Sequence, residues 1–172
     1  MGTIKDANRR VILWGYVFDK RTALALLLAN RRLGYDSLTI AQGSWSNATA
    51  SAGTHSKGGA VDLAPAFYAD KVRVLSRIGF AVWHRNAIPG LWGEHIHAVL
   101  IGDPLASDQA KEQWIDYAEG RDGLADGAPD TVKHPRNRRF HYWATRLAHP
   151  GLARQVDALP RYRDSTVGKT NG

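Results

Sequence analysis

Cysteine is absent from the 172-residue sequence, and this excludes several structures and chemistries. Without thiols the chain forms no disulfide, no thiolate zinc site and no cysteine nucleophile. Any metal site must therefore use histidine and carboxylate ligands. The absence leaves the cellular compartment open, because cytosolic proteins and many exported bacterial proteins both lack disulfides.

A long apolar run is also missing. The longest one, residues 23–29, is far shorter than the ~20 residues that cross a bilayer, so no membrane span is expected. The first residues carry charges but no continuous apolar stretch followed by a cleavage site. We therefore expect no signal peptide.

Acidic residues are scarce in the C-terminal part, where Asp157 is the only one between residues 131 and 163. This part supplies most of the net charge of +7, which favours polyanions such as nucleic acid, anionic lipid or bacterial wall polymers. We predict one compact domain over residues 1–120, which contains the core. Residues 121–172 are expected to form a basic, aromatic-containing extension that need be only partly ordered.

Hydrophobic periodicity predicts both helices and strands in the first 120 residues. Helices are expected over residues 19–33, 68–78 and 107–120. Strands are expected over residues 37–41, 59–63, 80–84 and 94–101. In the last strand His95 and His97 share one face, so two imidazoles point the same way.

His55, Asp62 and His97 are the predicted metal ligands. They supply two nitrogens and one oxygen, which leaves a fourth position open for water, as catalytic zinc requires. Small residues between His55 and Asp62 let the backbone turn tightly and approach a metal or substrate. An isolated histidine or aspartate is more often a surface or packed residue, but the joint spacing favours a metal site.

Glu94 precedes His97 by three residues and is the predicted general base. A carboxylate outside the ligand set can accept a proton from an activated water and pass it to the departing amine. Positions three apart on an ideal strand point to opposite faces, so this role requires Glu94 to lie in the loop before the strand. Otherwise His95 with His97 is the better pair.

These residues resemble the motifs of the zinc D-Ala-D-Ala metallopeptidase family, which includes D,D-carboxypeptidases, D,D-dipeptidases and L-alanyl-D-glutamate endolysins. The motif His-x-x-Gly-x-Ala-x-Asp is matched by residues 55–62, and Glu-x-x-His by residues 94–97. The resemblance covers about residues 38–102. It implies an α+β fold like that of hedgehog signalling domains, in which helices cover one face of a small antiparallel sheet.

The resemblance also implies roles for individual residues. His55, Asp62 and His97 would bind Zn²⁺, Glu94 would be the base, and His95 or a nearby donor would stabilise the oxyanion. His95 could instead be a ligand or simply a packed residue. Residues 1–120 would then be a zinc peptidase-like domain.

The implied function is zinc-dependent hydrolysis of a peptide bond in bacterial peptidoglycan or its stem peptides. The protein would be a D,D-carboxypeptidase or an endolysin-type endopeptidase. Since no signal peptide is expected, it would stay in the cytoplasm until it is released to the cell wall, or would be delivered by a phage.

Two positions depart from the family pattern. Gly53 stands where the family has serine, and Gln42 stands where it has an arginine that is expected to bind a substrate carboxylate. Glutamine performs this bidentate task poorly, so Arg85 could take it over, or the substrate could differ. The candidate substrate-binding residues are Gln42, Ser44, Arg85 and Trp92.

Two other functional classes stay open. A catalytically inactive wall-binding or structural module would keep the fold, with or without the zinc. A nucleic-acid-binding protein would use the C-terminal charge and bind in a strongly salt-dependent way without zinc. No nucleic-acid fold signature supports the second class, so nucleic acid is not the expected partner.

Overall fold

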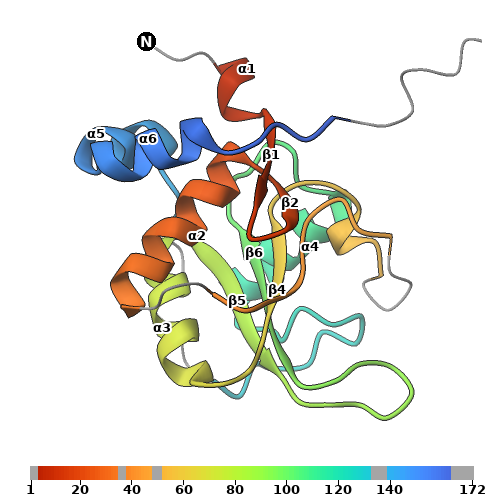
Figure 1. Ribbon diagram of the computed structural model, residues 1–172. Helices are drawn as coiled ribbons and strands as arrows, with labels where there is room; N and C mark the ends of the chain where they lie inside the picture. Colours follow the sequence, from red (N-terminus) through yellow and green to blue (C-terminus); the bar gives the residue numbers. More distant parts are fainter. Residues whose placement is uncertain (1–3, 35–37, 48–51, 133–138, 164–172) are drawn as a thin grey trace, which may run out of the picture.

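A four-stranded antiparallel sheet lies at the centre of the computed structural model, which describes residues 4–34, 38–47, 52–132 and 139–163 (Figure 1). The strand order is β3-β4-β6-β5. The strands are Ile40–Gln42 (β3), Ala60–Leu63 (β4), Phe80–Arg85 (β5) and His95–Leu100 (β6). With the helices packed around it, this sheet confirms the predicted α+β class.

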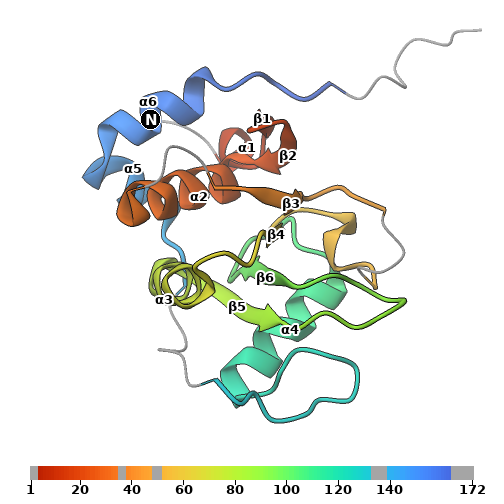
Figure 2. The ribbon, with the colours of Figure 1, turned by 60° about the horizontal axis from the view of Figure 1, so that its bottom comes forward.

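Helices cover both faces of the sheet, and not one face only as the resemblance implies. The helices α2 (Lys20–Leu33) and α3 (Tyr68–Ile78) bury the face that carries Val61, Val82 and Ile96. The helix α4 (Asp108–Glu119) lies on the opposite side of the sheet (Figure 2). None of the helices in the described part of the chain is long and apolar enough to cross a membrane.

The three predicted helices are confirmed. They could be predicted because local signals in the sequence set their ends. The Asp19 carboxylate caps α2 by accepting hydrogen bonds from the backbone N–H groups of Arg21 and Thr22. Ser107 caps α4 in the same way, through the N–H of Ala110. Glycines in the left-handed conformation follow the last residues of α2 and α4.

The strands differ from their predicted ranges at two ends that matter for the site. The first was predicted over residues 37–41, whereas β3 covers Ile40–Gln42; residues 35–37 lie outside the described part of the chain. The last was predicted to begin at Glu94, whereas β6 begins at His95. Gln42 therefore pairs within the sheet, and Glu94 precedes it.

A β-hairpin that sequence analysis missed precedes α2. Its strands are Arg10–Leu13 (β1) and Tyr16–Asp19 (β2), after the short helix Ile4–Ala7 (α1). The two turn residues, Trp14 and Gly15, have φ angles of 51° and 86°. This is the left-handed geometry of a two-residue hairpin turn, but tryptophan rarely adopts it, so the turn carries no recognisable signal.

Most of the core lies before residue 120, as expected, but the core also extends into the C-terminal part. Two helices, Tyr142–Ala148 (α5) and Pro150–Ala158 (α6), bury Tyr142, Leu152 and Val156 in the same apolar cluster as α2. The two helices span only seven and nine residues, so their apolar faces are too short to give a clear periodic signal in the sequence.

A buried lysine joins the two ends of the described chain. The Lys20 side chain is 2% exposed, and its ammonium group lies 3.1 Å from both Asp6 oxygens and 2.7 Å from Asp157. Arg146 contacts both oxygens of Asp157 and, with Lys20, lowers the pKa of Asp157 to about 2. The C-terminal helices are therefore held on α2 by charge as well as by apolar packing.

Two buried carboxyl groups meet where α2 approaches the loop after β6. Asp19 is 0% and Asp103 1% exposed. The Thr22 hydroxyl lies 2.8 Å from one Asp19 oxygen and 3.2 Å from one Asp103 oxygen, and the Leu105 N–H donates to the other Asp103 oxygen. Burial and the neighbouring Asp19 raise the pKa of Asp103 to about 8, so the folded pair holds a proton at neutral pH.

This proton makes stability depend on pH. The pKa of Asp103 is higher in the folded than in the unfolded state. The contribution of this group to the free energy of unfolding is therefore fully present below about pH 4 and is lost as the pH rises to about 8. The wild-type free energy of unfolding should fall by up to about 1.4 kcal/mol per pH unit in this interval. Asp103→Asn, which keeps an acceptor for Leu105 but does not titrate, should remove this slope in urea unfolding.

The exposed Asp70→Asn variant is the control and should keep the wild-type slope. Identical pH profiles for the wild type and Asp103→Asn would contradict the shared proton.

Gly58 lies in the connection between His55 and Asp62, and it has no room for a side chain. A Cβ atom there would lie 2.9 Å from Leu105 Cβ, 3.1 Å from Asp19 Oδ2 and 3.2 Å from the Trp45 ring. We expect Gly58→Ala to lower the free energy of unfolding by about 1–3 kcal/mol through overpacking. Gly151→Ala is the control: its Cβ would meet nothing within 4 Å, so this change should not lower the free energy of unfolding. Thermal unfolding of both variants tests this, and equal stabilities would refute it.

Candidate metal centre

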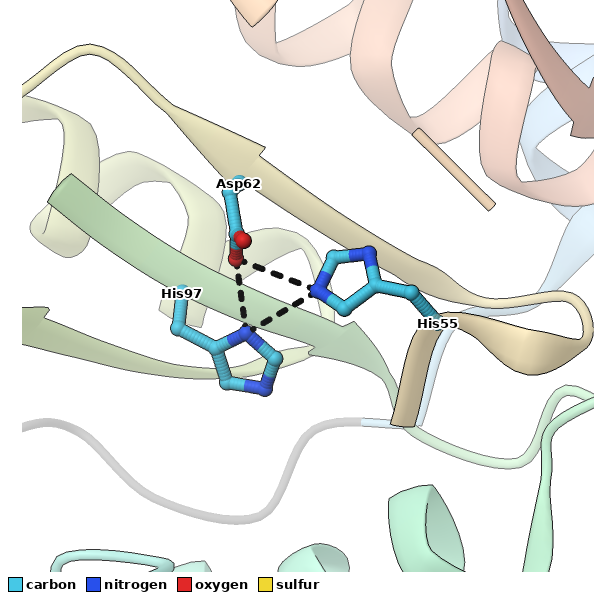
Figure 3. A group of neighbouring side chains, drawn as sticks. All are labelled: His55, Asp62 and His97. Carbon is cyan, nitrogen blue, oxygen red and sulfur yellow. Dashed lines mark hydrogen bonds and ion pairs between the residues drawn. The ribbon is translucent and has the colours of Figure 1, made fainter. Parts of the chain in front are cut away.

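Three side chains from separate segments converge at one point (Figure 3). Asp62 on β4 lies directly opposite His97 on β6, so both side chains project from the same face of the sheet. His55 comes from the 3-10 helix Thr54–Ser56, which precedes β4. His97 Nδ1 is 2.7 Å and His55 Nε2 is 3.2 Å from the same Asp62 oxygen. The ligand atoms of the three residues lie within 4.8 Å of one another, so this group can hold a metal ion.

The orientation of His55 is set by a backbone carbonyl. Its Nδ1 lies 3.0 Å from the oxygen of Gly43, which can only accept a hydrogen bond. Nδ1 therefore carries the proton, and Nε2 presents its lone pair toward Asp62. The ring is 1% exposed, so it is held without competition from solvent.

The orientation of His97 is set by Gln113 on α4. His97 Nε2 lies 2.8 Å from Gln113 Oε1, and the Gln113 amide nitrogen donates to the carbonyl of Gly123 over 2.9 Å. Because the amide nitrogen is already used, Oε1 is the acceptor, and the proton of His97 belongs on Nε2. The Nδ1 lone pair then faces Asp62 and His55.

The hydrogen bonds leave two lone pairs and a carboxylate facing one another. Gly43 and Gln113 each use the single N–H of a neutral imidazole, so neither His55 nor His97 has a second proton for Asp62. Protonation of a ring would supply one and would be favoured by Asp62, but burial has the larger effect and lowers the pKa of His97. A bound cation satisfies all three groups at once.

Asp62 contributes a full negative charge to this group. Burial by itself raises its pKa, but hydrogen bonds and charge from His55 and His97, which act once a ring proton faces the carboxylate, have the larger combined effect. The pKa of Asp62 therefore lies well below its usual range. Two nitrogens and one charged oxygen form a ligand set that suits a divalent cation and leaves coordination positions open.

A cavity of about 330 Å³ opens on the metal ligands. Its walls are formed by the sheet, the loop before His55, the β5–β6 connection and residues 123–125. Trp83 Nε1 donates to the Arg121 carbonyl, which holds this last segment near the sheet. Three of the predicted substrate-binding residues line the cavity: Gln42, Arg85 and Trp92.

Ser44, the fourth predicted substrate-binding residue, is buried and is not among the residues that line this cavity. Its hydroxyl donates to the carbonyl of Ala60 over 2.8 Å. Ser44 thereby ties the end of β3 to the start of β4, next to Asp62. Its role in substrate binding stays a prediction.

The two predicted catalytic residues differ in their contacts. Glu94 borders the cavity, but its carboxylate lies 2.7 Å from His84 Nε2. His84 projects from the face of β5 opposite to the metal ligands, and its ring stacks on that of Tyr68 in α3, with 4.0 Å between the ring centroids. The Glu94 side chain is 49% exposed and lies outside regular strand pairing, as its predicted role requires.

His95 shares the face of β6 that carries His97 and lines the cavity. Its Nδ1 lies 2.7 Å from the Gly93 carbonyl oxygen, so Nδ1 is the donor and Nε2 keeps its lone pair. His95 does not belong to the group of three ligands in the described chain. Its oxyanion role stays a prediction.

Sequence reasoning missed Gln113. No local pattern distinguishes it from the other polar residues of α4, because its function depends on α4 crossing the sheet beside His97. Such a contact between distant segments has no signal in a single sequence.

Comparison with known proteins does not place the chain in a family. No family model, no curated protein and no solved structure matches the chain.

Gln113 should control metal affinity without touching the metal. Gln113→Leu removes the acceptor for His97 Nε2–H, so zinc affinity should fall about ten- to a hundredfold. Gln113→Glu keeps an acceptor and should bind zinc nearly as well as the wild type. Zinc titration in competition with a chelator measures both, with the exposed Gln155→Leu as control. Equal losses in Gln113→Leu and Gln113→Glu would exclude the acceptor role.

Proposed function

We propose that the protein is a zinc-dependent peptidase that hydrolyses a peptide bond in bacterial peptidoglycan or its stem peptides. The observation that carries the proposal is the convergence of His55, Asp62 and His97 on one point at the base of a cavity. Two nitrogens and a carboxylate oxygen with open positions form the donor set of many catalytic zinc sites. When bound, zinc supplies Lewis acidity that activates water and polarises a carbonyl oxygen.

The contacts favour His95 over Glu94 as the general base. His95 Nε2 has a free lone pair on the face of the metal ligands, whereas the Glu94 carboxylate is bonded to His84. Glu94 remains the alternative, because rotation of its exposed side chain would release it from His84. In either case the base would take a proton from water and return it to the departing amine.

Peptidoglycan as the substrate is supported by the motif resemblance and by charge. The net charge of +7 favours anionic polymers of the wall and their stem peptides, which carry carboxylates. The alternative is a wall-binding module that keeps the fold and the metal but has no activity. The contact of the Glu94 carboxylate with His84 supports this alternative if Glu94 is the base, because it turns the carboxylate away from the metal group.

The test is hydrolysis of purified peptidoglycan and defined muropeptides by the zinc-loaded protein, with released amines and zinc content quantified. His97→Ala should lose both zinc and cleavage. His95→Ala should keep zinc and lose cleavage, whereas Glu94→Ala should keep both. The exposed His141→Ala is the control and should behave as the wild type.

Loss of cleavage in Glu94→Ala but not in His95→Ala would move the base to Glu94. Stoichiometric zinc with no cleavage of any muropeptide would reject the peptidase and support the wall-binding module.

A further inference from the structure

A second cleft, of about 370 Å³, lies between the last turn of α2 and the first half of α3, which are neighbours in Figure 2. These two helices cover the face of the sheet opposite to the one that carries Asp62 and His97. Among the described residues, none that lines this cleft also lines the cavity at the metal ligands. The cleft is therefore separate from the candidate metal centre.

The lining of this cleft combines apolar and charged side chains. It consists of Leu33, Phe67, Val74, Arg32, Arg73 and Asp70. Val74 is 7% exposed, whereas the Phe67 ring is 74% exposed and so is accessible to a ligand. Two positive charges against one negative charge favour an anion, and the apolar residues favour a ligand that also carries C–H groups.

The exposed ring of Phe67 is held by a strained backbone. Its φ and ψ angles are 56° and 39°, a left-handed conformation that bulky residues rarely adopt. At 74% exposure the ring gains little from packing in the core. Strained residues of this kind are concentrated at sites of function. The conformation of Phe67 therefore supports a contact between its ring and a ligand.

The cations at the cleft form a row. Arg73 and Arg77 are exposed and lie about one turn apart on the same side of α3, and the exposed Arg32 lines the cleft from α2. Asp70 lies 2.7 Å from Arg73, but the two side chains are 59% and 51% exposed, so this pair is weak. Separate cations in a row suit a chain with repeating negative charges better than one small anion.

The shape of the cleft selects among polyanions. Val74 is buried at the cleft and cannot insert into a bilayer, so an anionic membrane surface fits poorly. Single-stranded nucleic acid needs successive aromatic rings for its bases, but the Tyr68 ring already stacks on His84. In a polymer of sugars or polyols joined by phosphodiesters, charges and C–H groups alternate along one line. This alternation matches the arginines and the apolar lining.

We propose that the cleft between α2 and α3 binds a linear polymer of sugars or polyols joined by phosphodiesters. Arg32, Arg73 and Arg77 bind its phosphates, and the Phe67 ring contacts a unit between them. The site holds the protein on a surface that is rich in this polymer. It uses neither the metal ligands nor the cavity beside them, so it does not depend on the proposed peptidase activity.

The test measures the binding of poly(glycerol phosphate) to the zinc-loaded protein by calorimetry at several salt concentrations. Arg32→Gln and Arg73→Gln should each weaken binding about fivefold, the effect of one basic residue at an anionic surface, and should lessen its salt dependence. Arg154→Gln removes an exposed cation from α6 and is the matched control. It should leave the affinity unchanged, because salt screens charges that do not contact the polymer.

Two further variants separate binding from folding. Asp70→Asn should strengthen binding, because it removes the opposing charge and releases Arg73. Phe67→Asn should weaken binding without lowering the free energy of unfolding, because asparagine adopts the left-handed conformation more readily than phenylalanine. Thermal unfolding is measured beside calorimetry. A Phe67→Asn variant that loses stability but keeps its affinity would exclude the role of the ring.

Equal weakening by Arg154→Gln and Arg73→Gln would overturn the inference, because binding would then follow net charge alone. So would tighter binding of single-stranded DNA or polyglutamate than of poly(glycerol phosphate), or binding only to vesicles that contain anionic lipid. His97→Ala should bind the polymer as tightly as the wild type. Loss of muropeptide cleavage with intact polymer binding therefore rejects the peptidase alone, and the reverse result rejects the cleft alone.

Discussion

The candidate site depends above all on the pairing of β4 with β6, which sets Asp62 directly opposite His97. Antiparallel register puts both side chains on one face, and a shift by one residue would send one of them to the opposite, apolar face. The register is held by the apolar residues that alternate with them, since Val61 and Ile96 pack beneath α2 and α3. The same pattern that builds the core therefore positions the ligands.

The third ligand depends on contacts outside the sheet. His55 reaches the other two because the Gly43 carbonyl orients its ring and because Gly58 lets the chain pack against Leu105. The loop that contains Leu105 is in turn joined to α2 through Asp103 and its shared proton. Helix capping and loop packing thus connect α2 to the candidate metal group.

Much of the fold could be predicted because its signals are local. Caps at Asp19 and Ser107 and glycines after two helices fixed the helix ends, and alternation located the central strands. The hairpin at Trp14 and the C-terminal helices could not be predicted in this way. The first uses a turn residue that rarely adopts positive φ, and the second buries Tyr142 and Val156 against a helix more than a hundred positions away.

The sequence by itself indicated which groups could bind a metal, because the lack of cysteine restricts the ligands to histidine and carboxylate and the spacing singles out His55, Asp62 and His97. Tertiary structure alone decided which nitrogen of each histidine faces the site, since that follows from hydrogen bonds to residues distant in the chain. It also decided that the Glu94 carboxylate contacts His84. Side-chain types are encoded position by position, whereas protonation and orientation depend on neighbours that only folding brings together.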